Sequence, residues 1–145
     1  MKSTVGPEPI RSILTPVDRS PGSRRAVKLA AQMARAFGAK LTLLHVTPVK
    51  ELPVLMAEAE DLREEEEAEL ILAEETKLAR SIGVEPSIAV RRGHTATQIL
   101  RYATDSQPDL IVMGSRGLKG AKGVLLGSVS RTVSLKAKTQ VLLVP

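Results

Sequence analysis

Five short apolar runs alternate with longer segments of helical periodicity, and this alternation constrains the fold more than any other feature of the sequence. The runs are apolar almost throughout instead of at every second residue, which is typical of strands buried on both faces of a parallel sheet. Pro16 predicts that ladder pairing stops near the end of the first run, and Pro86 predicts that the third strand lies near an edge. The predicted strands are 13–17, 41–46, 84–90, 109–113 and 141–145.

The intervening segments predict four helices, over 26–37, 53–81, 95–104 and 128–137. Apolar residues of the first recur at three- and four-residue spacing, and Gly38 follows as a left-handed terminal residue. A turn is expected before it, at 18–22.

The two middle helices carry weaker signals. Residues 53–81 are rich in Glu, Ala and Leu, but the carboxylates of 64–67 interrupt the apolar stripe. The first half of this segment is therefore open to two interpretations, a packed helix or a solvated, mobile segment. Thr95 and Gln98 have the spacing of a capping box and predict that a helix begins with Thr95 as its cap.

The order of these elements predicts one α/β domain over residues 1–145, with residues 1–10 as a flexible N-terminal extension. The expected architecture is a Rossmann-like, doubly wound five-stranded parallel sheet with strand order 3-2-1-4-5 and helices on both faces. Ligands of such sheets bind beyond the carboxyl ends of the strands. The segments 18–23 and 114–127 both begin at strand carboxyl ends, so they are expected to form one crevice.

Residues 113–128 hold half of the ten glycines, together with the basic residues Arg116, Lys119 and Lys122. The spacing matches neither GxxxxGK[ST] nor GxGxxG, which argues against a Walker ATPase and a dinucleotide dehydrogenase. Glycine backbone followed by a helix N-terminus at Ser128 nonetheless has the features of an anion cradle. A flexible surface loop with a serine cap is the alternative interpretation.

Charge favours an anionic ligand. The net charge is +5, but residues 57–75 contain ten acidic residues and one basic residue, so the rest of the chain carries twenty basic against six acidic side chains, or +14. Nucleic acid is disfavoured as the anion because Phe37 and Tyr102 are the only aromatic residues. The pairs Arg24-Arg25 and Arg91-Arg92 are assigned to solvated loops, and residues 64–67 to a solvated helix face.

Other chemistries are constrained by what the sequence lacks. There is no cysteine, which excludes thiol chemistry and favours a cytoplasmic location. His45 and His94 are the only histidines, so a transition-metal site is not expected; His45 is interpreted as a core or rim histidine, and His94 as exposed. No run of about 18 uncharged apolar residues occurs, so no membrane span is expected.

The glycines carry a family resemblance. Gly114, Gly117 and Gly127-Ser128 read G-x2-G-x9-G-[ST], which resembles the ATP-binding motif of the universal stress protein family. The segments ILTPVDRS (13–20), LLHV (43–46), PDLIVMGSRG (108–117) and VLLVP (141–145) are similar to further family segments, so the resemblance covers almost the whole chain. Two departures are Arg19, where many members have glycine, and Ser130 in place of a common threonine.

The resemblance implies a site for ATP, with Mg²⁺ or Mn²⁺ held by the phosphates. Val17 and Val46 would border the adenine, with main-chain groups near Val17 reading its edge, and Asp18 would face the ribose or a phosphate-bound cation. The implied binding residues are Pro16, Val17, Asp18, Val46, Met113, Gly114, Ser115, Arg116, Gly117, Gly127, Ser128, Val129 and Ser130. Neither a catalytic residue nor a protein-held metal is assigned.

Three function classes remain open at this point. The preferred hypothesis is an ATP-binding regulatory protein whose nucleotide orders the 117–127 loop and so signals to partners. The alternatives are a slow ATPase or phosphotransferase and, less favoured, a nucleic-acid-binding module. Family members commonly dimerise through the last strand, so a homodimer through residues 139–144 is expected.

Overall fold

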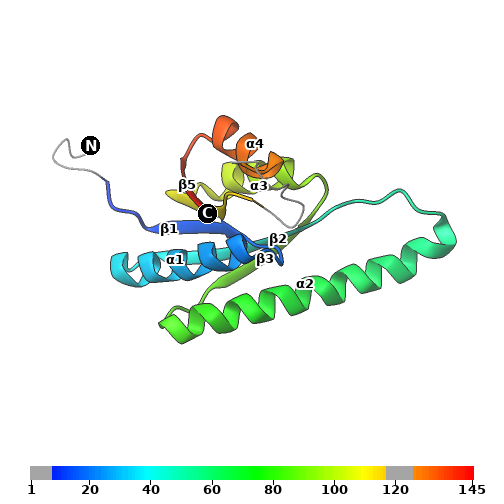
Figure 1. The fold of residues 1–145 in the computed structure, drawn as a ribbon, viewed down its shortest axis with the longest axis horizontal. Helices are drawn as coiled ribbons and strands as arrows, with labels where there is room; N and C mark the ends of the chain where they lie inside the picture. The colour runs from blue at the N-terminus through cyan, green and yellow to red at the C-terminus, as the bar shows by residue number, and fades with distance from the viewer. Residues whose placement is uncertain (1–7, 117–125) are drawn as a thin grey trace.

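A computed structural model of the chain describes residues 8–116 and 126–145, and it confirms the expected sheet (Figure 1). All four strand pairings are parallel, and the strand order is β3-β2-β1-β4-β5. β1 therefore lies at the centre, and β3 and β5 form the two edges. The strands are β1 (Ser12–Pro16), β2 (Lys40–Thr47), β3 (Ser87–Arg92), β4 (Leu110–Gly114) and β5 (Gln140–Val144).

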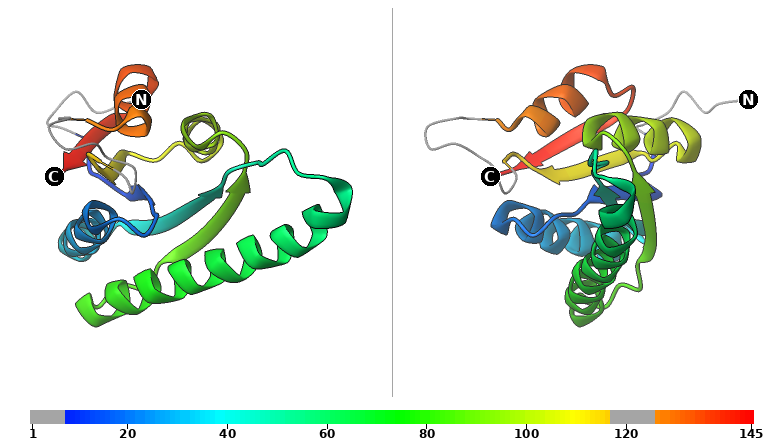
Figure 2. Two further views of the ribbon diagram at one scale, coloured as in Figure 1. Left: turned by 45° about the vertical axis from the view of Figure 1, so that its right-hand side comes forward. Right: turned by 90° about the vertical axis from the view of Figure 1, so that its right-hand side faces the viewer.

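Two helices cover each face of the sheet (Figures 1 and 2). On one face, α1 (Pro21–Phe37) and α2 (Val54–Ile82) enclose a core that includes Ile13, Leu43 and Val112. On the other, α3 (Thr95–Ser106) and α4 (Ser128–Lys136) enclose a second core around Leu14, Leu44 and Ile111. Consecutive strand residues thus point into different cores, which explains why the strands are apolar throughout.

The third strand begins three residues later than predicted because the chain first completes the end of α2. Gly83 adopts a left-handed conformation (φ 97°), and the N–H of Val84 donates to the carbonyl oxygen of Ala79. Glu85 then forms two 2.7 Å hydrogen bonds with the guanidinium of Arg80. These residues therefore belong to the helix cap, although their apolar pattern resembles that of a strand.

The first helix begins at Pro21, inside the segment expected to be a turn. Ser20 is its N-cap, since its hydroxyl oxygen accepts a hydrogen bond from the N–H of Ser23 at 3.1 Å. Proline is favoured at the next position because its missing N–H has no helical acceptor there. Arg24 and Arg25 consequently lie in this helix, and the assignment of this pair to a loop is wrong.

The third helix is capped one residue earlier than the sequence predicts. His94, which is exposed as expected, is the N-cap, and its Nδ1 accepts a weak 3.4 Å hydrogen bond from the N–H of Thr97. The capping box with Thr95 as its cap is therefore wrong, because Thr95 already lies in the helix. An imidazole nitrogen here takes the place of the usual serine or aspartate oxygen.

The second helix is continuous from Val54 to Ile82, and its first half reaches beyond the sheet (Figure 2). Contrary to the expectation of a solvated face, Glu64 is buried, with 8% of its side chain exposed. Its carboxylate lies 3.9 Å from Nζ of Lys50 and 3.7 Å from Nη2 of Arg92, and Arg92 also pairs with Asp61 at 2.6 Å. Arg92 is a residue of β3, so its assignment to a loop is also wrong.

We expect Arg92→Ala to destabilise the projecting half of α2. Arg92 connects edge strand β3 to Asp61 and Glu64, whereas its neighbour Arg91 stacks over the ring of Tyr102, 4.9 Å from its centroid. Arg92→Ala should lower the midpoint of thermal unfolding and speed amide hydrogen exchange in residues 54–64 more than Arg91→Ala does. Equal effects of the two substitutions would show that the ion pairs do not hold the helix.

Candidate functional site

The two segments expected to form one crevice, 18–23 and 114–127, meet through a pair of glycines. A Cβ atom added at Gly114 would lie 2.9 Å from the carbonyl carbon of Gly22 and 3.0 Å from the nitrogen of Ser23. A Cβ at Gly22 would lie 3.2 Å from the carbonyl oxygen of Arg116. The backbone at the end of β4 therefore packs directly on the first turn of α1, at a distance that only glycine permits.

Asp18 is held in a hydrogen-bonded turn at the end of β1. Its Oδ1 accepts from the N–H of Ser20 at 2.7 Å, and its own N–H donates to the hydroxyl oxygen of Ser23 at 3.0 Å. Ser20 in turn caps α1. This half-buried carboxylate is oriented by the protein itself, before any ligand arrives.

The backbone of Val17 is already largely paired. Its N–H donates to the carbonyl oxygen of Leu44 at 2.8 Å, and its carbonyl oxygen lies 3.0 Å from Nδ1 of His45, which donates in the tautomer that fits. This half-buried histidine at the edge of the crevice thus has a satisfied structural contact. A ligand could use only the second lone pair of the Val17 carbonyl, which leaves less for base recognition than the sequence interpretation assumes.

The apolar residues expected to border adenine do not all face the same way. Val46 and Met113 belong to the core on the α3–α4 face, and both are more than nine-tenths buried. Val17 belongs to the core on the α1–α2 face. Val46 and Met113 therefore share one face of the sheet, and the Val17 side chain lies on the opposite face. Pro16, the last residue of β1, is buried.

The peptide groups of Ser115 connect β4, β5 and α4. Its N–H donates to the carbonyl oxygen of Val144 at 2.8 Å, and its carbonyl oxygen accepts from the N–H of Gly127 at 2.7 Å and the hydroxyl of Ser130 at 2.6 Å. Both ends of the glycine segment are thereby joined. Ser130 is 98% buried, and its hydroxyl supports the site through this contact, a role that its sequence position did not reveal.

The N-terminus of α4 is open in a way that the N-terminus of α1 is not. Gly127 is its N-cap, and no side chain in the described ranges caps it, whereas Ser20 caps α1. The first intrahelical bond comes from the N–H of Arg131 to the carbonyl oxygen of Gly127. The preceding amides, of Ser128, Val129 and Ser130, are the groups that a helix N-terminus offers to an anion.

The remaining predicted residues are placed as follows. Arg116 is exposed directly after the β4 end, and Ser128 is exposed at the start of α4. Gly117, Lys119 and Lys122 lie outside the described residues. Within residues 8–116 and 126–145, no group of three His, Asp or Glu side chains is arranged to hold a metal ion, and no helix is long and apolar enough to cross a membrane.

The sequence of the chain matches a known family model. The model described as "Universal stress protein family" matches residues 9–145. The chain belongs to the universal stress protein family. It is 34% identical over 138 residues to a universal stress protein of Methanocaldococcus jannaschii, covering 92% of this chain and 81% of that protein.

Solved structures of family members agree with the fold. Universal stress protein UspA from Lactobacillus plantarum superposes with a TM-score of 0.86 at 22% identity, covering 96% of this chain and all of that chain (100%). A universal stress protein solved in complex with cAMP is 29% identical, with a TM-score of 0.70 and coverage of 95% of this chain and 98% of that chain. Adenine nucleotide binding thus occurs among relatives of the chain.

We predict that Gly114→Ala forces the β4 end and α1 apart. The added methyl group meets backbone atoms at 2.9 and 3.0 Å, so the substitution should cost about 2–3 kcal/mol of folding free energy. Gly38→Ala is the control, because its methyl group meets nothing within 4 Å and the left-handed backbone (φ 65°) alone should cost about 1 kcal/mol.

Two measurements test this prediction. Chemical denaturation compares the two free energies of unfolding, and amide chemical shifts locate the disturbance. Gly114→Ala should shift the amides of residues 18–23, which Gly38→Ala should leave in place. Unchanged shifts at 18–23 in Gly114→Ala would contradict the close packing of the two strand ends.

Proposed function

We propose that this universal stress protein binds ATP at the carboxyl ends of β1 and β4 and acts as a nucleotide-dependent regulatory module. The observation that carries the proposal is the N-terminus of α4, which lacks a side-chain cap in the described structure and follows the G-x2-G-x9-G-[ST] motif. Main-chain amides and the positive end of the helix dipole favour a phosphate there. The relative solved with cAMP supports an adenine nucleotide as the ligand class.

The proposed roles follow the positions of the residues. The amides of Ser128, Val129 and Ser130 bind phosphate oxygens, and Arg116, exposed after β4, adds a positive charge. Gly114 belongs to the floor of the site because its packing on Gly22 brings the β1 and β4 ends together. Gly117 and the loop that the nucleotide would order lie mainly outside the described residues.

The base and the ribose are assigned to the rest of the crevice. Val46 and Met113 supply apolar surface for the adenine, whereas Pro16 and Val17 contribute main-chain groups at the end of β1. Asp18 is oriented by Ser20 and faces the ribose. The buried hydroxyl of Ser130 donates to the carbonyl oxygen of Ser115 and so joins the start of α4 to the end of β4; it does not contact the ligand.

A divalent cation fits this site only when the phosphates of the nucleotide coordinate it. Asp18 is the carboxylate at the β1 end, and one of its oxygens already accepts from Ser20. Mg²⁺ or Mn²⁺ would neutralise phosphate charge, with Asp18 acting through water.

Gly127→Val tests the phosphate site. Gly127 has φ −70°, a conformation that valine adopts without strain, and the substitution keeps the N–H that donates to Ser115. The isopropyl group would nevertheless cover the first amides of α4. We expect the Kd for ATP to rise at least about tenfold, or roughly 1.4 kcal/mol.

Ser134→Val is the matched control, because it adds a valine on an exposed position of the same helix. Isothermal titration of both variants and the parent chain gives the three affinities, and circular dichroism confirms that the fold is retained. Unchanged ATP affinity in a folded Gly127→Val variant would contradict the site.

Dimerisation through β5 is a further part of the proposal. β5 is an edge strand, and Val141, Leu142, Leu143 and Val144 are each only half-buried. Antiparallel pairing with a second copy would remove this apolar edge from water. Sedimentation velocity at rising protein concentration should show a monomer–dimer equilibrium, whereas a monomer at every concentration would contradict this part.

A further inference from the structure

A pocket beside the proposed nucleotide site, sharing Asp18 with it, lies between the first turn of α1 and the middle of α2. Its volume is about 440 Å³, within the range of small-molecule sites. Pro21, Leu70 and Ile71 supply apolar surface, and the carboxylates of Asp18, Glu74 and Glu75 line the same space. The pocket therefore combines an apolar wall with a concentration of negative charge.

Glu75 is the most deeply placed of these carboxylates, with 4% of the residue exposed. Its Oε1 lies 3.4 Å from Nη1 of Arg24, whereas Oε2 is closed to water and has no hydrogen-bond partner in the described residues. A buried carboxylate oxygen without a donor is costly. Glu75 lines the pocket, so an unpaired carboxylate oxygen lies just beneath the pocket surface.

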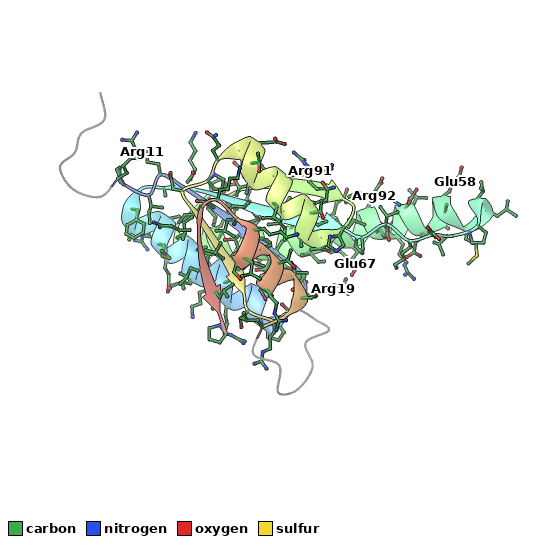
Figure 3. All side chains as sticks on the ribbon, turned by 90° about the horizontal axis from the view of Figure 1, so that it is seen from above. Arg11, Arg19, Glu58, Glu67, Arg91 and Arg92 are labelled. Carbon is green, nitrogen blue, oxygen red and sulfur yellow. The ribbon has the colours of Figure 1, made fainter. Side chains whose placement is uncertain are left out.

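The charged groups around Glu75 do not neutralise its carboxylate. Burial raises the pKa of Glu75, and the neighbouring Glu74 and Asp18 raise it further, against the opposing effect of Arg24. Arg19 also lines the pocket, but its guanidinium pairs at 3.5 Å with Glu67, a residue that does not line it (Figure 3). Three carboxylates therefore line the pocket against two guanidiniums, one of which pairs with Glu67, so negative charge is in excess.

We propose that this pocket binds a small organic cation, an ammonium or guanidinium group on a short alkyl chain. The cation donates an N–H to Oε2 of Glu75, and its alkyl chain lies against Pro21, Leu70 and Ile71. Entry requires that Arg24 rotates aside, which its 55% exposed side chain and its long 3.4 Å contact permit. The apolar wall and the size of the pocket favour an organic cation over a bare metal ion.

The proposal does not rest on the proposed function, although both sites use Asp18. Agmatine is a suitable probe because it carries both cationic groups on a four-carbon chain. Titration of the full chain, followed by amide chemical shifts, should give saturable shifts at residues 19–24 and 70–75. Glu75→Gln keeps the shape of the side chain and should weaken agmatine binding at least about tenfold. Glu66→Gln, on an exposed residue of α2 outside this pocket, should leave it unchanged.

A second variant distinguishes a loss of agmatine binding from a structural effect of Glu75→Gln. Leu70→Trp leaves Glu75 intact but fills the pocket from an exposed position, and it should also weaken binding. n-Butanol and MgCl₂ are the ligand controls: neither should reproduce the agmatine shifts. The absence of saturable shifts, equal binding by Glu75→Gln, or the same shifts with Mg²⁺ alone would each overturn the proposal.

Discussion

The structure depends on one close contact, the packing of the β4 end on the first turn of α1 through Gly114 and Gly22. No Cβ atom fits at Gly114 without moving backbone atoms of α1. The contact fixes the distance between the carboxyl ends of two neighbouring strands, which is where the winding of the sheet reverses. Gly114 is expected from the sequence to contact the ligand, but it also has a packing role of its own.

Ser115, the residue after Gly114, connects this contact to the rest of the site. Its two peptide groups bond to β5, to the N-cap of α4 and to the hydroxyl of Ser130. Because the N–H of Gly127 bonds to the carbonyl oxygen of Ser115, the two ends of the glycine-rich segment lie side by side. An insertion between them can therefore be tolerated without a change in the core. α4 then begins without a side-chain cap in the described structure, and its amides remain available to an anion.

The sheet was predictable from the sequence because parallel strands buried on both faces leave continuous apolar runs, and all five runs are strands. The errors lie where local contacts compete with that pattern. Val84 to Pro86 look like a strand but complete the cap of α2, and Glu64 looks solvated but is buried beneath Lys50 and Arg92. The α2 cap is a local contact, whereas Lys50 and Arg92 are distant in sequence from Glu64 and leave no signal in its local sequence. For the site, the position of segments 18–23 and 114–127 at strand carboxyl ends predicted that they meet. The paired backbone of Val17 and the contact of Ser130 with Ser115 required the structure.

The central claim is that the open N-terminus of α4, held beside the β1 end, binds the phosphates of an adenine nucleotide. A crystal structure of the chain with a non-hydrolysable ATP analogue tests it most directly. The account predicts phosphate oxygens within hydrogen-bonding distance of the main-chain N–H groups of Ser128 to Ser130, with the adenine near Val46. Phosphates bound elsewhere on the molecule, with those amides facing only water, would contradict it.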